Sequence, residues 1–123
     1  MSTDLTLTKT AVTLYGNLQP NVDTIIFDSE FQAQIRSIII FAPRGEIVVE
    51  FYLADTEIGD FLLDKIIFNS AGTAENLLNH MQISMNDLNE NKYFDLQANV
   101  KIKLVLITGI AGVNYNINCQ LYD

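Results

Sequence analysis

Hydrophobic and polar residues alternate along most of the chain, the pattern of strands that bury one face. The final stretch shows this most clearly, because four apolar residues alternate there with four amides. The apolar positions are Tyr115, Ile117, Cys119 and Leu121, and the amide positions are Asn114, Asn116, Asn118 and Gln120. The pattern predicts a strand of an antiparallel sheet with one face in the core and the other in solvent.

The same alternation predicts further strands. From Val100 to Thr108, apolar residues alternate with Lys101 and Lys103. We expect this segment to form a hairpin with the last strand through Gly109 to Gly112. Glu46 to Leu53 places Ile47, Val49, Phe51 and Leu53 inward, and Pro43 to Gly45 before it forms a tight turn. The other expected strands are Leu5 to Thr8, Ala11 to Tyr15, Val22 to Phe27, Phe61 to Phe68 and Met81 to Met85.

Strands at this spacing predict an all-β fold, an antiparallel β-sandwich or jelly-roll-like domain. We expect one domain over residues 1–123, with residues 1–10 as a first strand or an N-terminal arm. The segment from Thr73 to Met81 fits either a short helix capped by Thr73 or a loop that leads into a strand. We favour the loop, with at most one short helix in the chain.

The run from Ile38 to Phe41 is apolar on both faces. Such a run indicates either a central strand covered on both sides or a strand that faces another subunit. Under the second interpretation, Ile38, Ile40 and Phe41 lie in an interface.

Composition and charge narrow the classes of function. The 123 residues are 49% hydrophobic, enough for a packed core. Fifteen acidic and seven basic residues give a net charge of −8, which argues against binding to nucleic acid or to an anionic membrane surface. No apolar run approaches the roughly 20 residues of a transmembrane helix, and the first residues do not resemble a signal peptide.

Residues with catalytic potential are scarce. Cys119 is the only cysteine, which excludes an internal disulfide, and it is either a small core residue or a reactive thiol. His80 is the only histidine, and we expect it in an exposed loop. A structural zinc site needs three or four cysteine or histidine ligands, so we expect no such site, no cofactor and no enzymatic activity.

Asp55, Glu57, Asp60 and Asp64 form the densest acidic cluster, which is the one candidate for a calcium site. Their spacing does not match an EF-hand, and a solvated turn between strands is the simpler interpretation. Carbohydrate binding needs exposed flat aromatic residues, and only Tyr52 and Tyr122 are expected to face outward from strands. A ligand-binding module for calcium or carbohydrate is therefore the alternative hypothesis.

The order of the strands is similar to that of small bacteriophage virion proteins, such as head decoration, neck or tail proteins. The resemblance covers most of the chain from Thr13 onward, and its segments are Thr13 to Tyr15, Thr24 to Phe27, Ile35 to Ile40, Ile47 to Leu53 and Val113 to Cys119. It implies a structural sandwich that is commonly a homo-oligomer.

Our leading hypothesis is thus a non-enzymatic virion structural protein, a capsid decoration or neck or tail component that binds other proteins. We expect a trimer that contacts other virion proteins and is assembled in the host cytoplasm. Besides the run from Ile38 to Phe41, Leu5 and Leu7 belong to an arm that can pair with a neighbouring edge.

Overall fold

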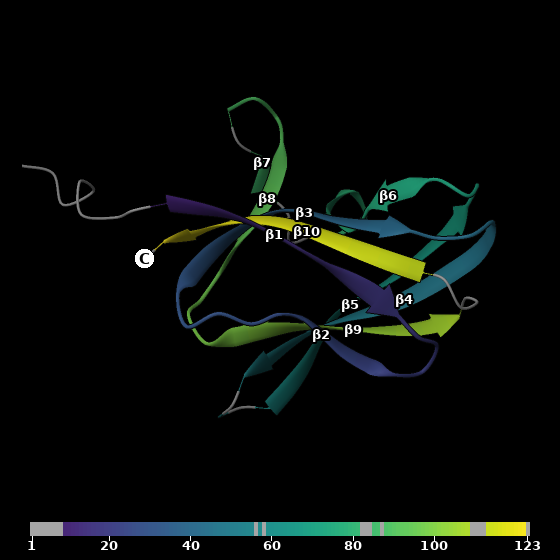
Figure 1. Ribbon diagram of the computed structural model, residues 1–123, viewed down its shortest axis with the longest axis horizontal. Helices are drawn as coiled ribbons and strands as arrows, with labels where there is room; N and C mark the ends of the chain where they lie inside the picture. Colours follow the sequence, from purple (N-terminus) through teal and green to yellow (C-terminus); the bar gives the residue numbers. More distant parts are fainter. Residues whose placement is uncertain are drawn as a thin grey trace, which may run out of the picture.

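The computed structural model describes residues 9–55, 57, 59–81, 85–86, 88–108 and 113–122. The described chain is built almost entirely of strands (Figure 1). They are β1 (Lys9–Leu18), β2 (Asp23–Phe27), β3 (Gln32–Phe41), β4 (Gly45–Asp55), β5 (Gly59–Ser70), β6 (Ala74–Asn76), β7 (Met85–Asn86), β8 (Lys92–Leu96), β9 (Val100–Thr108) and β10 (Val113–Tyr122).

The strands form two antiparallel sheets that pack face to face, which confirms the predicted β-sandwich. One sheet has the order β1-β10-β3-β8-β7, with the short β6 paired to the remaining part of β3. The other has the order β2-β9-β4-β5. Figure 1 shows the six-stranded sheet as the upper layer and the four-stranded sheet as the lower one.

The core lies between the two sheets and is filled by the inward residues of both. The expected inward side chains Ile47, Val49 and Phe51 of β4 are buried. The ring of Phe51 meets that of Phe94 on β8 edge to face, with 6.0 Å between centroids, and so joins the two layers. Along strands such as β3 and β10, alternation therefore fixes which face is buried, as the sequence pattern predicts.

The predicted hairpin between the last two strands is wrong. β9 lies in the four-stranded sheet between β2 and β4, whereas β10 lies in the six-stranded sheet between β1 and β3. β10 pairs with β1 along its whole length, from Lys9 opposite Tyr122 to Leu18 opposite Val113. β9 and β10 are adjacent in the sequence but belong to different layers. β10 pairs instead with β1, at the other end of the described chain.

The segment from Thr73 to Met81 combines the two expected alternatives. It contains the three-residue strand β6, followed by a single 3-10 turn, η2 (Leu77–His80). The cap is Asn76 and not Thr73, because the Asn76 side chain accepts a hydrogen bond from the Leu78 amide. Both Leu77 and Leu78 are buried, so core packing holds the turn in place.

Two expected strands lie partly or wholly outside the described residues. The segment from Leu5 to Thr8, with the candidate interface residues Leu5 and Leu7, falls before residue 9. Of the segment from Met81 to Met85, Met81 is a buried residue outside any strand, and Met85 begins β7. Within the described ranges, no helix is both long and apolar enough to cross a membrane.

Candidate functional site

The outer surface of the six-stranded sheet carries a group of uncharged side chains, which we call the neutral face. It consists of the outward residues of β1 after Lys9, of β10 before Tyr122 and of the end of β3: Ala11, Thr13, Tyr15, Asn17, Asn114, Asn116, Asn118, Gln120, Ser37, Ile39 and Phe41. Strand register places nine of them in three rows: Thr13, Asn118 and Ser37; Tyr15, Asn116 and Ile39; Asn17, Asn114 and Phe41. The chain's 15 acidic and 7 basic residues all fall outside this set.

Hydrogen bonds link the polar side chains of the neutral face across strands. The Thr13 hydroxyl donates to Asn118 Oδ1 at 2.8 Å, and Asn118 Nδ2 donates to the Ser37 hydroxyl at 2.9 Å. The same Nδ2 group also lies 3.2 Å from Asn116 Oδ1. One asparagine therefore connects three strands, and the amide side chains are held in a defined orientation.

Aromatic and aliphatic side chains stand among these amides. Tyr15 is 80% exposed and Phe41 is 48% exposed, while Ile39 between them is partly buried. Ile38 and Ile40, which we expected in an interface, are instead fully buried in the sandwich core. That expectation was wrong for these two residues because β3 is a central strand, flanked by β10 and by β6 and β8. Only Phe41 of the three expected residues reaches the surface.

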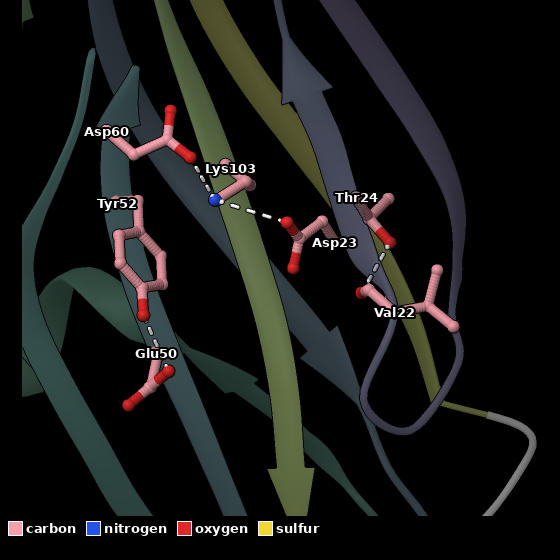
Figure 2. Close-up of polar contacts among 7 residues, drawn as sticks. All are labelled: Val22, Asp23, Thr24, Glu50, Tyr52, Asp60 and Lys103. Carbon is pink, nitrogen blue, oxygen red and sulfur yellow. Dashed lines mark hydrogen bonds and ion pairs between the residues drawn. The ribbon is translucent and has the colours of Figure 1, made fainter.

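The outer surface of the four-stranded sheet is organised differently, around Lys103 (Figure 2). Lys103 is only 7% exposed although it points away from the core. Its ammonium group donates to Asp60 and to Asp23, the latter at 3.3 Å, and lies 4.4 Å from the centre of the Tyr52 ring. Lys103 occupies a polar position of the predicted strand, and carboxylates and a ring from neighbouring strands enclose it.

These contacts favour the protonated forms of Lys103 and Tyr52. The hydrogen bond to Asp60 is the main reason that the pKa of Lys103 is raised, against the opposing effect of burial. The hydroxyl of Tyr52 donates to Glu50 at 2.7 Å, and this bond raises the pKa of the tyrosine. A protonated amine and a neutral phenol offer no nucleophile or base at neutral pH. We interpret the cluster as a stabilising network.

Cys119 and His80 also have structural environments. Cys119 is buried in the core of the six-stranded sheet, and this burial raises the pKa of its thiol to about 11. It therefore behaves as the small core residue that was one of the two expected alternatives. His80 ends the η2 turn at the surface, where its Nε2 lies 3.0 Å from Glu75 and its ring stacks on Phe68.

The acidic cluster does not converge on one point. Asp60 is bound to Lys103, Asp55 accepts a hydrogen bond from the Glu57 amide, and Asp64 accepts one from the Lys65 amide. In the described part of the chain, no three acidic, histidine or cysteine residues are grouped closely enough to hold a metal ion. The four carboxylates are close in the sequence, but Asp60, Asp64 and Asp55 each bond to a different partner.

Two of the open hollows formed by the described residues have largely polar walls. One of about 430 Å³ lies where β6 and β8 both approach β3, and its walls are Arg36, Asn76, Asn79, Glu90, Asn91 and Lys92. Another, of about 550 Å³, is lined by Asp28, Asp55, Glu57, Ala98, Asn99 and Lys101. Lys101 lies 3.7 Å from Asp28 there, so a positive charge already faces the carboxylates. Neither hollow contains His80, the residue on which an acid–base mechanism would depend.

The edge strand β5 also exposes apolar side chains. Phe61, Leu62 and Ile67 are each about half exposed or more. The same strand carries Asp60, Asp64 and Lys65, and charges of this kind discourage edge-to-edge pairing.

No protein-family profile matches the sequence, and no curated protein matches it. Among solved structures, the fold is similar to that of a Bacillus endospore appendage protein, described as belonging to a novel family of disulfide-linked pili. The TM-score is 0.51, and the match covers 94% of this chain and 88% of that one. Sequence identity is 10%, so the likeness concerns the fold alone.

Proposed function

We propose that this protein is a non-enzymatic structural subunit that works through contacts with other proteins, including copies of itself. The observation that carries the proposal is the neutral face, where exposed Tyr15 and Phe41 stand among ordered amides. The centres of protein interfaces are typically depleted in charge and enriched in aromatic residues. A surface of this composition on an otherwise acidic chain is therefore suited to protein contact.

The proposal extends to a place in a bacteriophage particle, as a decoration, auxiliary capsid, neck or tail component. The strand order that is similar to small virion proteins supports this place, and the described residues form the sandwich that the resemblance implies. The fold likeness to an appendage protein of a pilus family adds an example of such a sandwich in an assembled structure. Leu5 and Leu7 would contribute an arm that pairs with a neighbouring edge.

Light scattering during size-exclusion chromatography, over a wide range of protein concentrations, tests the first part. We expect a mass above that of the 13.8 kDa chain, and its multiple separates the trimer expected from the sequence from other oligomers. Sedimentation with purified phage particles tests the second part. A strict monomer that also fails to sediment with particles or with surface appendages would contradict the proposal.

A carbohydrate-binding module is the second candidate, and Tyr15 favours it. An exposed tyrosine beside hydrogen-bonding amides can stack on a sugar ring while the amides bind its hydroxyl groups. Binding would raise the melting temperature, because the ligand would bind only the folded state. A glycan panel measured by thermal shift, with Tyr15→Ala as the control, tests this candidate. The same assay in millimolar calcium should show no shift, because the acidic residues are dispersed.

A further inference from the structure

We infer that the neutral face is the contact between two copies of this chain related by a two-fold axis. The inference rests on the proposed function and deepens it, because it names the surface and its occupant. Three properties of the face support it: its lack of charge, the chemistry of its amides and the position of its aromatic side chains.

The charge of the protein favours this face for contact between identical copies. Each chain carries a net charge of −8, so two copies repel one another over most orientations. The neutral face contains no acidic or basic side chain, and its approach to a second copy therefore opposes no like charges across the contact. A basic partner would instead be attracted to exposed carboxylates such as those of Asp23 and Asp60 on the other sheet.

Amide side chains are complementary to themselves. A carboxylate or an ammonium group near a two-fold axis meets its own copy and is repelled. An asparagine carries both donors and an acceptor, and so it can form hydrogen bonds with an identical asparagine. Two-fold contacts use the same patch on both subunits, and a surface rich in amides satisfies this condition. Asn114, Asn116 and Asn118 place amide groups at every second position of β10, and those of Asn116 and Asn118 already hydrogen-bond to each other within the chain.

The apolar side chains provide anchors within this polar surface. Tyr15, Asn116 and Ile39 form one row across three strands, and Phe41 belongs to the next row. Tyr15 and Phe41 can therefore pack against a second sheet while the central amides form hydrogen bonds. Buried aromatic anchors commonly contribute most of the binding energy of an interface. The edge strand β5 also exposes apolar residues, but Asp60, Asp64 and Lys65 interrupt them.

Charge-swap variants at Asn116 test the inference. Asn116 is partly buried in the central row, and its Oδ1 accepts from Asn118, a role that aspartate can keep. In the full chain, we expect Asn116→Asp and Asn116→Lys each to raise the dissociation constant of the dimer at least about tenfold, because each introduces like charges across the two-fold contact. Mixing the two variants should restore association, because the opposite charges then face each other. Defective folding of either variant cannot produce such restoration.

Asn69 provides the matched control. It is an exposed asparagine on β5 of the other sheet, and Asn69→Asp and Asn69→Lys make the same chemical changes away from the neutral face. We expect both to leave the dissociation constant within about twofold, as surface substitutions outside an interface usually do. Analytical ultracentrifugation measures all five proteins and the mixture. Raising the salt concentration should strengthen the wild-type dimer, because salt screens the repulsion between the two acidic chains.

The possible results separate this inference from the proposed function. A wild-type dimer weakened by the Asn116 variants and rescued by their mixture supports both. A dimer that only the Asn69 variants weaken, a strict trimer, or a neutral face that binds a glycan without dimerisation overturns the two-fold contact. In the first two cases the structural role survives, because copies still assemble. A monomer at every concentration overturns the contact, and sedimentation with particles then decides the structural role separately.

Discussion

The two outer surfaces of the sandwich achieve order by opposite means. On the four-stranded sheet, Lys103 is enclosed by Asp23, Asp60 and Tyr52, so its positive charge is balanced by carboxylates of the same molecule. On the neutral face, Asn118 orders its neighbours through hydrogen bonds between uncharged groups. An ion cluster of the first kind satisfies its own partners and contributes to the stability of the chain. The neutral face carries no charge that would oppose a second copy of the acidic chain, so it is the better site for contact.

The largest expected effect on stability distinguishes the core side of β3 from its outer side, which belongs to the neutral face. We expect Ile40→Ala to lower the free energy of unfolding by about 2–5 kcal/mol, because it creates a cavity in the core. Its neighbour Phe41 points outward, and Phe41→Ala should change the stability of the monomer by less than about 0.5 kcal/mol. Urea unfolding of both variants at low protein concentration provides the measurement. Equal losses would contradict the assignment of Phe41 to the surface.

The next effect concerns the other outer surface. Lys103→Ala should lower the free energy of unfolding by about 1–2 kcal/mol, which is less than for a wholly buried pair, because the carboxylates of Asp23 and Asp60 remain largely solvated. Lys101→Ala on the same strand is the matched control. Its exposed pair with Asp28 should contribute at most about 1 kcal/mol. If chemical denaturation shows the two variants to be equally stable, the enclosed cluster does not stabilise the chain.

Alkaline pH should gradually remove the contribution of Lys103 to the free energy of unfolding. The pKa of Lys103 is raised in the folded state, so its contribution is complete below the pKa of the unfolded lysine, about 10.4. It is then lost as the pH rises through the folded value. The raised pKa of Tyr52 acts in the same direction, because ionisation of the phenol destabilises its bond to Glu50. Melting temperatures measured between pH 9 and roughly pH 11.5 should fall more steeply for the wild type than for Lys103→Ala.

The smallest effect concerns the hydrogen bonds of the neutral face. Asn118→Ala removes bonds to Thr13 and Ser37, and we expect a loss of about 1 kcal/mol in the free energy of unfolding. A double-mutant cycle with Ser37→Ala isolates the coupling between the two side chains. A coupling energy near zero would show that the amides are ordered by the strands alone.

Local patterns predicted the strands well, because alternation is a property of neighbouring residues. The amide side of β10 was evident in the sequence from Asn114 to Gln120. The other residues of the neutral face could not be assigned, because the pairing of Tyr15 and Ile39 with Asn116 joins distant parts of the chain. The same limitation explains the wrong hairpin between β9 and β10.

The burial of Lys103 illustrates a second limit. Lys101 and Lys103 occupy equivalent outward positions on β9, and the sequence pattern treats them alike. Lys103 is enclosed because Asp23 on β2, and Tyr52 and Asp60 on β4 and β5, converge on it. Similarly, the four carboxylates close in sequence from Asp55 to Asp64 do not gather at one point, since Asp55 and Glu57 line one hollow whereas Asp60 binds Lys103. Proximity along a strand therefore says little about the grouping of polar side chains.

The position of Cys119 determines how copies of this chain can be joined. Its thiol is buried and its pKa is raised to about 11, so it is neither accessible nor ionised at neutral pH. The chain has no other cysteine, and a covalent link of the kind named for the appendage family would require this residue to leave the core. Assemblies of the native chain should therefore be reversible, dissociate on dilution and respond to reducing agents no more than the single chain does.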